Sequence, residues 1–448
     1  MSRKYFGTDG VRGPYGGTLI NEDFAWRLGA AAGRFAKERK SAAGTRIFIG
    51  RDTRASGVAL EKALAGGLQS EGFTVVSLGI VPTPVVSLMT REGGAALGVV
   101  ITASHNPARD NGVKFFDFNG IKLTDAEEER IEAYLPPAAG NGTVGYPLME
   151  APLARYLERT TSILPPHGLS GWKVVLDTAN GAASVSSGRV LEALGASLVL
   201  VGTHPDGKNI NEGVGSQHPE KMAEKVRATG ARIGVAHDGD ADRCVLCDET
   251  GEILDGDEIL TVLALHALRR DKLVRRTLVV TVQSNLGVDA AISAAGGRVL
   301  RTQVGDRYVM DRMLAEGATL GGESSGHIIC AEISSTGDGL VAALKIIQVM
   351  IETGRPLSEL RRGLTRYPQS TNALRVCEKK PLDSLHRLNA EIKAVEEELG
   401  SAGRVLVRYS GTEPKLRLLV EGPNDAIVQS SMERLVAAAH AELDIVRS

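Results

Sequence analysis

The feature that most constrains the fold of this chain is a strand–helix–strand pattern that occurs three times. Each copy ends in a Gly-Ala-x-Leu/Ile-Gly sequence, at residues 94–98, 230–234 and 317–321. Ahead of it come an apolar segment, a segment with apolar residues at helical spacing that closes on a glycine, and a second apolar segment. Strands that alternate with helices form parallel sheets, so the pattern predicts three similar α/β domains.

The expected units are residues 46–50, 56–72 and 73–78, then 172–177, 182–195 and 196–201, then 277–282, 288–297 and 298–302. The tail beyond Pro368 differs, with strand-like segments at 372–376, 403–408 and 415–420 and helical ones at 381–399 and 425–443. We therefore expect three similar α/β domains with mixed, mostly parallel sheets, plus a C-terminal α+β domain with a partly antiparallel sheet, around a central cleft. The predicted domains are 1–155, 156–255, 256–368 and 369–448.

Each copy of the pattern runs into a different polar loop. The first loop is Thr-Ala-Ser-His-Asn-Pro, with Ser104 and His105; the second is Asp-Gly-Asp-Ala-Asp-Arg, residues 238–243; the third is Glu-Ser-Ser-Gly-His, residues 323–327. Open α/β sheets bind ligands at the carboxyl ends of their strands. If the three domains share a fold, the loops occupy equivalent positions and converge on one cleft.

The second loop predicts a metal site. Asp238, Asp240 and Asp242 alternate, so an extended loop turns all three carboxylates to one side, where they suit a hard cation. A calcium EF-hand is an alternative, since Glu249 falls at its twelfth position, but Arg243 stands where that motif needs glycine. A solvated acidic turn is the plain alternative. One Mg²⁺ ion fits best.

Ser104 is then a candidate for phosphoryl transfer. No Gly-x-Ser-x-Gly elbow surrounds it, and sequence adjacency to His105 does not establish a hydrolytic triad. A serine beside a metal site points instead to phosphoryl transfer, with the Ser104 side chain exposed on its loop and His105 structural. His327 is either a general acid/base or a structural histidine. Glu323 is either a ligand for sugar hydroxyls or an ordinary loop carboxylate.

A fourth polar stretch, Arg-Tyr-Ser-Gly-Thr-Glu-Pro-Lys-Leu-Arg, resembles an anion cradle. Its hydroxyl side chains, exposed backbone N–H groups and flanking guanidinium groups suit a phosphate, although an ordinary hairpin turn is the alternative. The residues concerned are Arg408, Ser410, Gly411, Thr412 and Arg417. No nucleotide-binding motif occurs, so the enzyme would carry its own phosphoryl group on Ser104.

Composition excludes several classes of partner. The net charge is -2, which gives no basis for nucleic acid or an anionic membrane, and no apolar run is long enough for a membrane span. The start of the chain lacks the apolar core of a signal peptide, and four cysteines are too few for a disulfide framework, so we expect a cytoplasmic protein. The Cys244–Cys247 pair reads as part of a strand.

Taken together, the four motifs resemble the α-D-phosphohexomutase superfamily over essentially the whole chain. The stretches Tyr-Phe-Gly-Thr-Asp-Gly-Val-Arg-Gly at 5–13 and Val-Gly-Asp-Arg-Tyr-Val at 304–309 are similar to its glucosamine branch. The resemblance implies a Ser104 phosphate that ligates Mg²⁺ together with the three aspartates. It also implies interconversion of glucosamine 6-phosphate and glucosamine 1-phosphate through glucosamine 1,6-bisphosphate.

The same resemblance implies roles for further residues. Arg12, Lys114, Arg243 and His327 would surround the reacting centre, Glu323 and Ser325 would contact sugar hydroxyls, and the Arg408 loop would hold the phosphate that does not react. Two alternatives stay open: a phosphomannomutase/phosphoglucomutase, and a non-catalytic phosphosugar sensor on the same scaffold. The oligomeric state also stays open, with a homodimer among the options.

Overall fold

The structure is a computed structural model, and it describes residues 3–39, 44–140, 145–410 and 414–446. It contains two compact units. The larger unit comprises Met1–Gln283 and Ala295–Gly363, and the smaller one comprises Ser284–Ala294 and Leu364–Ser448. In the described part of the chain, no helix combines the length and the apolar character needed to cross a membrane.

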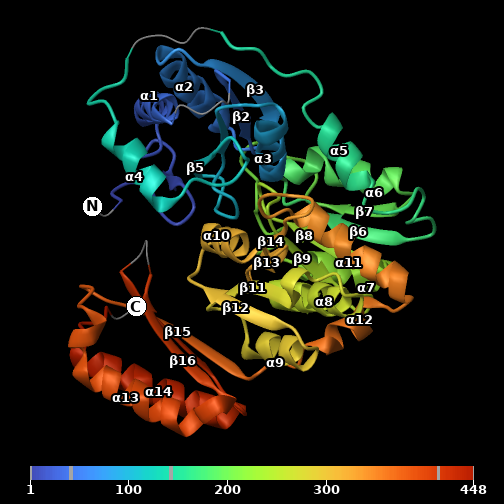
Figure 1. Ribbon diagram of the computed structural model, residues 1–448, viewed down its shortest axis with the longest axis vertical. Helices are drawn as coiled ribbons and strands as arrows, with labels where there is room; N and C mark the ends of the chain where they lie inside the picture. The colour runs from blue at the N-terminus through green and yellow to red at the C-terminus, as the bar shows by residue number, and fades with distance from the viewer. Residues whose placement is uncertain (1–2, 40–43, 141–144, 411–413, 447–448) are drawn as a thin grey trace. The chain divides into compact units, whose positions relative to one another are not determined.

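The sheets of the larger unit repeat one strand arrangement three times (Figure 1). In each sheet a first strand lies between two parallel partners, and the second of these partners pairs antiparallel with the next strand along the chain. The repeated orders are β3-β2-β4-β5, β7-β6-β8-β9 and β12-β11-β13-β14. The predicted set of three similar α/β domains is therefore confirmed.

The first sheet adds β1 at one edge, and the second adds β10. The strands of the first sheet are β1 (Val11–Pro14), β2 (Arg46–Arg51), β3 (Thr74–Ile80), β4 (Leu97–Ile101) and β5 (Asp110–Phe116). Those of the second are β6 (Lys173–Asp177), β7 (Ser197–Val201), β8 (Ile233–His237), β9 (Cys244–Cys247) and β10 (Ile253–Leu254). Those of the third are β11 (Thr277–Thr281), β12 (Arg298–Thr302), β13 (Leu320–Gly322) and β14 (Ile328–Cys330).

Helices cover the sheets of the larger unit. They are α1 (Glu22–Glu38), α2 (Gly57–Ser70), α3 (Thr83–Glu92), α4 (Asp125–Ala133), α5 (Ala154–Thr161), α6 (Ser187–Ala193), α7 (Glu220–Thr229), α8 (Gly256–Arg269), α10 (Asp306–Glu316), α11 (Gly339–Thr353) and α12 (Leu357–Leu360). Local sequence sets several of their starts: the Thr124 side chain and Glu127 form a capping box at α4, and Asp255 and Glu258 form one at α8.

One expected helix is interrupted. The continuous helix predicted over residues 182–195 is wrong, because a 3₁₀ turn over Ala182–Val185 precedes α6 and Ser186 leaves helical geometry with φ -130°. The hydroxyl groups of Ser184 and Ser186 donate to the backbone carbonyls of Gly181 and Ala183. Such local bonds compete with a regular helix.

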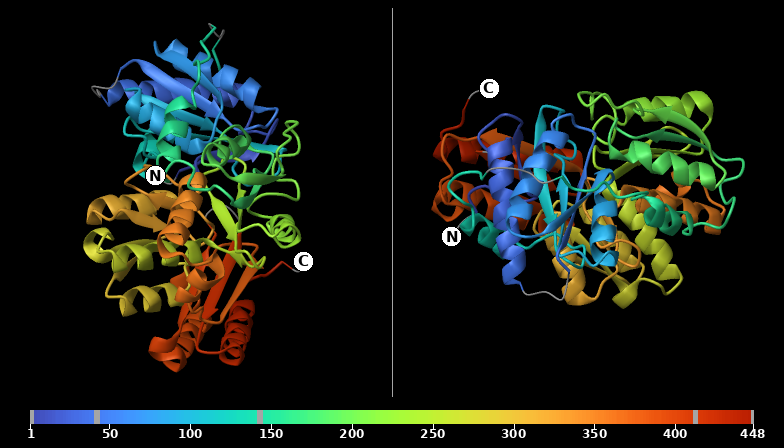
Figure 2. Two further views of the ribbon diagram at one scale, coloured as in Figure 1. Left: turned by 90° about the vertical axis from the view of Figure 1, so that its right-hand side faces the viewer. Right: turned by 90° about the horizontal axis from the view of Figure 1, so that it is seen from above.

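The smaller unit has a fully antiparallel sheet, so the prediction of a partly antiparallel sheet is wrong. Its order is β15-β17-β16, with β15 (Gln369–Arg375), β16 (Arg404–Tyr409) and β17 (Lys415–Glu421). The helices are α9 (Leu286–Ala294), α13 (His386–Leu399) and α14 (Asp425–Glu442). In Figures 1 and 2, α13 and α14 lie along one face of this sheet, where Leu388, Leu418 and Leu435 share an apolar core.

Candidate active site

The three polar loops of the larger unit occupy equivalent places in the repeated sheets. Each connects the third strand of its repeat to the antiparallel fourth strand: residues 102–109 join β4 to β5, residues 238–243 join β8 to β9, and residues 323–327 join β13 to β14. A shared strand order presents these loops at the same end of each sheet. The contacts below show that all three loops meet in one cluster.

Ser104 lies in the middle of this cluster. Its Oγ donates a hydrogen bond to Asp238 Oδ2 at 2.5 Å, so the first and second loops touch. The backbone at Ser104 has φ 51°, in the left-handed region. The expectation of an exposed Ser104 is wrong: the residue has 0% exposure, because the Asp238 loop covers it.

Two side chains fix the Ser104 loop through its backbone. Arg54 is 1% exposed, and its Nη2 donates to the carbonyl oxygens of Ser104 at 3.0 Å and Asn106 at 2.8 Å. Asn211 Nδ2 donates to the same two oxygens at 2.8 and 3.0 Å. Asp52 Oδ2 accepts a hydrogen bond from Arg54 Nε at 2.9 Å, which holds the guanidinium in place. These bonds fix the position of the loop backbone.

The three aspartates form the metal-type cluster predicted from their spacing. Oxygen atoms of Asp238, Asp240 and Asp242 lie within 4.8 Å of one another, and all three residues are buried. Burial first, and then repulsion from the other two carboxylates, raises the pKa of Asp238 well above its usual value. Asp240 Oδ1 is buried and has no hydrogen-bond partner in the described part of the chain. A buried oxygen left unpaired among three carboxylates fits a bound divalent cation.

Positive charge reaches the aspartates from β5. Lys114 is 1% exposed, and its Nζ lies 3.0 Å from Asp240 Oδ2 and 3.3 Å from Asp242 Oδ2. Burial alone would lower the pKa of Lys114, but Asp240, Asp242 and Asp9 raise it above its usual value. Asp9 also pairs with Arg12. The predicted Lys114 and Arg12 therefore belong to the same charged network.

His327 joins the network from the third loop. Its Nδ1 lies 3.5 Å from Asp242 Oδ1, and its Nε2 lies 3.1 Å from Asp306 Oδ2. Burial would lower the pKa of this imidazole, but Asp242 and Asp306 raise it to about 10. The backbone N–H of Gly337 also donates to Nε2 at 3.0 Å, a bond that needs the lone pair of a neutral ring nitrogen, so the two carboxylates and this N–H favour opposite protonation states of the imidazole.

Arg243, Glu323 and Ser325 line the same region. Arg243 Nη1 lies 3.1 Å from His105 Nδ1, and burial together with the charge of Arg243 lowers the pKa of His105 to about 4. Glu323 Oε1 accepts from the Gly305 N–H at 3.0 Å. Among the described residues, Ser325 Oγ and Arg243 Nε are buried without a hydrogen-bond partner. Such buried groups suit a polar ligand that completes their bonds.

The candidate phosphate cradle lies in the smaller unit. Arg408 on β16 stands directly opposite Arg417 on β17. Like charges in this position repel, and burial together with Arg417 lowers the pKa of Arg408. Arg408 Nη2 is buried and has no hydrogen bond to the described residues. Ser410 is buried, whereas the predicted Gly411 and Thr412 lie outside the described residues.

Comparison with known proteins adds an independent observation. Four family models match: the alpha/beta/alpha domains I, II and III of the phosphoglucomutase/phosphomannomutase family at residues 3–138, 154–251 and 255–367, and the C-terminal domain of that family at residues 373–438. A phosphoglucosamine mutase of Desulfovibrio desulfuricans is 45% identical over 99% of this chain and 100% of its own length. One of Moorella thermoacetica is 47% identical over 97% of this chain and 99% of its own.

This chain belongs to the phosphoglucosamine mutase family.

Members of the phosphoglucosamine mutase family are isomerases of the phosphohexomutase superfamily, and solved structures agree with that placement. A phosphoglucomutase/phosphomannomutase family protein from Burkholderia thailandensis has a TM-score of 0.83 and 26% identity, covering 99% of this chain and 100% of its own. The expected family and the four-domain α/β architecture with mixed sheets are confirmed.

Three residues of the candidate site were missed by reasoning from the sequence. Asp9, Lys122 and Asp306 form a chain of ion pairs beside the aspartate cluster, with Lys122 Nζ at 2.7 Å from Asp9 Oδ1 and 2.5 Å from Asp306 Oδ2. Asp9 and Asp306 lie inside the stretches 5–13 and 304–309 that carry the family resemblance, so a signal existed for them. Lys122 has no such signal.

Proposed function

We propose that this chain interconverts glucosamine 6-phosphate and glucosamine 1-phosphate, with Ser104 as the carrier of the phosphoryl group. The observation that carries the proposal is the 2.5 Å hydrogen bond from Ser104 Oγ to Asp238, inside a buried cluster of three aspartates. A hydroxyl bonded to a carboxylate and surrounded by charged groups supports phosphoryl transfer over a packing role.

The metal of this site is proposed to be one Mg²⁺ ion. Asp238, Asp240 and Asp242 would hold it, together with an oxygen on Ser104, because carboxylate oxygens are the ligands that hard divalent cations prefer. When bound, the ion would neutralise charge on the phosphoryl group that is transferred.

The proposed reaction has two transfers. The C1 hydroxyl of glucosamine 6-phosphate attacks the phosphorus on Ser104, the bond from phosphorus to Oγ breaks, the hydroxyl proton passes to Oγ, and glucosamine 1,6-bisphosphate forms. The bisphosphate turns over, Ser104 Oγ attacks the phosphorus on O6, the bond from that phosphorus to O6 breaks, O6 receives the Oγ proton, and glucosamine 1-phosphate leaves. Lys114 and Arg243 supply positive charge beside the aspartates, and His327 is the proposed proton carrier because its ring nitrogens lie beside Asp242 and Asp306 in the same cluster.

The sugar and its second phosphate are assigned to two groups of residues. Glu323 and Ser325 are proposed to bind the sugar hydroxyls, since both are buried or partly buried beside His327 and Ser325 Oγ lacks a described partner. Arg408, Ser410 and Arg417, with Gly411 and Thr412, are proposed to bind the phosphate that does not react. The facing guanidinium groups of Arg408 and Arg417 support an anion there.

We further propose the domain limits 1–155, 156–255, 256–368 and 369–448, a cytoplasmic location and a homodimer. The family model matches at 3–138, 154–251, 255–367 and 373–438 are consistent with the limits.

The substrate assignment is tested with a panel of hexose phosphates. Purified protein, with Mg²⁺ and with a chelator, is assayed on the phosphates of glucosamine, glucose and mannose. We expect the highest kcat/KM with the amino sugar and loss of all turnover with the chelator, because the three carboxylates repel without a cation. Equal or better turnover of mannose 1-phosphate would favour the phosphomannomutase/phosphoglucomutase alternative.

The phosphoserine is tested separately with the variant Ser104→Ala. Intact-mass analysis after incubation with glucosamine 1,6-bisphosphate should find one phosphoryl group on the wild type and none on the variant, and the variant should lose mutase turnover. An unmodified wild type would favour the phosphosugar sensor. Substantial turnover by the variant would place the nucleophile elsewhere.

A further inference from the structure

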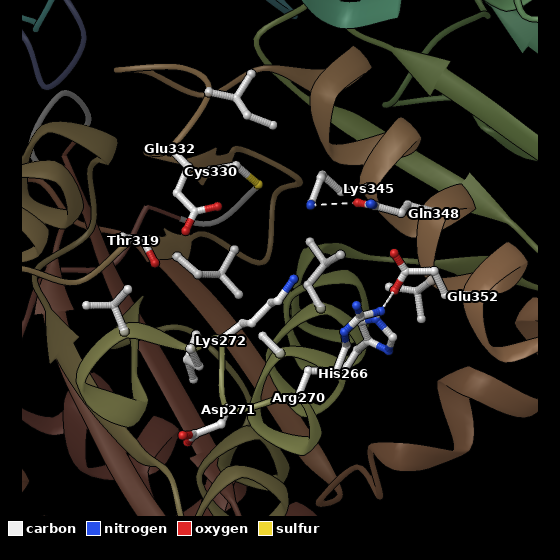
Figure 3. A pocket seen from close by; sticks show the side chains of 17 residues that line it. His266, Arg270, Asp271, Lys272, Thr319, Cys330, Glu332, Lys345, Gln348 and Glu352 are labelled. Atoms are coloured by element: carbon white, nitrogen blue, oxygen red, sulfur yellow. Dashed lines mark hydrogen bonds and ion pairs between the residues drawn. The ribbon is translucent and has the colours of Figure 1, made fainter. Parts of the chain in front are cut away.

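A second cavity of about 510 Å³ lies in the larger unit, between α8, α11 and the strands β13 and β14 (Figure 3). None of the described residues that line it belongs to the active site. It is nevertheless built on the same strands, since Cys330 in its wall is the last residue of β14 and His327 stands just before the first. Its volume is in the range of small-molecule sites.

One wall of this cavity is apolar. Leu263 from α8, Leu320 from β13 and Val349 from α11 line it, and all three are buried. Cys330 adds a thiol that is 8% exposed, and burial raises its pKa to about 12, so it is a neutral thiol and part of the apolar wall. These side chains suit the apolar body of a ligand.

The charged residues of the cavity are not all paired. Glu352 accepts from His266 Nε2 at 2.8 Å and also pairs with Arg270, so its charge is balanced. The Asp271 side chain is 91% exposed and pairs with Arg276. Glu352 and Asp271 are therefore each paired with a cation, so the remaining charge in the cavity comes from other lining residues.

Two ammonium groups remain for a ligand. Lys345 on α11 is half-buried and donates only to the neutral Gln348 Oε1, at 2.7 Å, among the described residues. Lys272 has no ion pair or side-chain hydrogen bond in the described part of the chain. In Figure 3 both ammonium groups point toward the middle of the cavity. Glu332 is the remaining carboxylate in the lining, and it is exposed. The interior therefore carries an excess of positive charge beside an apolar wall.

We propose that this cavity binds a small organic anion, with an apolar ring against Leu263, Leu320 and Val349 and one anionic group between Lys272 and Lys345. Neither Lys272 nor Lys345 forms an ion pair with a described carboxylate, which favours a single negative group between them, and the apolar wall favours a ring over a bare inorganic ion. The proposal does not rest on the proposed mutase activity, because binding is measured without turnover.

The probe is 1-anilinonaphthalene-8-sulfonate, which combines an aromatic ring system with one sulfonate and fluoresces in an apolar site. It is titrated into the full-length protein below its unfolding temperature. We expect saturable binding that Lys272→Gln and Lys345→Gln each weaken by about tenfold, the loss of one charge-assisted contact. Arg269→Gln, which removes one charge from the exposed end of α8 outside the cavity lining, is the matched control and should leave the affinity unchanged.

Two competitors separate the parts of the ligand. Uncharged N-phenyl-1-naphthylamine and inorganic sulfate should each displace the probe far less well than a second aromatic sulfonate does. The proposal is overturned if the wild type does not bind the probe, if the control weakens binding as much as the lysine variants do, or if sulfate alone displaces it as well. Melting temperatures show whether each variant is folded, and Lys272→Gln decides the question if Lys345→Gln unfolds, since Lys272 is exposed.

Discussion

At the scale of single residues, the environment of a side chain decides its chemistry more than its type does. Three histidines of the larger unit illustrate this. Burial lowers the pKa of His105 and of His237 to about 4, and the charge of Arg243 contributes to the shift of His105. By contrast, Asp242 and Asp306 raise the pKa of His327 to about 10. Neighbouring carboxylates thus favour a proton on His327, whereas burial disfavours one on the other two, and no pattern in the sequence distinguishes the three histidines electrostatically.

The effect of burial on a side-chain pKa can be tested at Asp338 through the pH dependence of stability. This buried residue caps α11 by accepting from the Val341 N–H at 3.0 Å, and it accepts from Tyr156 Oη at 2.9 Å. Burial raises its pKa from 3.8 to about 6. The folded state thus favours the protonated acid, and stability is lost as the pH rises from about 4 to about 6, by about 3 kcal/mol in total.

The variant Asp338→Asn keeps an accepting oxygen but cannot ionise. Relative to the wild type it should therefore gain about 3 kcal/mol of unfolding free energy as the pH rises from about 4 to about 6, with no further gain above that. Urea unfolding at a series of pH values measures the difference. Asp271→Asn, at a side chain that is 91% exposed, is the control and should show a flat difference. If the difference in unfolding free energy between Asp338→Asn and the wild type also stays constant with pH, then burial does not raise the pKa of Asp338.

At the scale of elements, the active site depends on the close approach of two loops. A Cβ on Gly239 would lie 2.6 Å from the Ser104 carbonyl oxygen and 2.7 Å from Ile210 Cδ1. Neither the Ser104 backbone, which Arg54 and Asn211 hold, nor the buried Ile210 has room to move. The second loop can reach Ser104 only because residue 239 has no side chain.

Gly239→Ala should therefore lower the unfolding free energy by about 1–3 kcal/mol through overpacking. It should also reduce kcat by up to about 100-fold, because Ser104 and Asp238 move apart. Calorimetry and steady-state kinetics measure the two effects. Gly145→Ala, where an added Cβ has nothing within 4 Å, is the control and should change neither. Wild-type kinetics in Gly239→Ala would show that the contact of the loops does not set the rate.

At the scale of the whole molecule, charged contacts join distant parts of the larger unit. Arg307 on α10 makes two 2.7 Å bonds to the Glu128 carboxylate on α4, and both side chains are 3% exposed. Arg3 also reaches Glu128 at 2.7 Å. These contacts tie the third repeat to the first and hold α10, which begins at Asp306, behind His327.

Arg307→Met should lower the unfolding free energy by about 3 kcal/mol, since it leaves Glu128 buried with Arg3 as its one remaining cationic partner among the described residues. Arg312→Met on the same helix removes an exposed pair with Glu316 and should cost less than about 1 kcal/mol. Thermal unfolding of both variants gives the comparison. Equal losses would mean that the buried pair does not stabilise the joined repeats.

The sequence by itself determined the repeated strand–helix–strand units, a separate α+β tail and the three polar loops, because periodicity and turn residues act locally. It also determined which residue types could form a metal and phosphoserine site. Only the tertiary structure decided that Ser104 is buried, that Arg54 fixes its loop, and that Asp9, Lys122 and Asp306 form one charged chain with His327. Those contacts join residues up to about 200 positions apart, and they depend on how separate sheets pack, which no local pattern records.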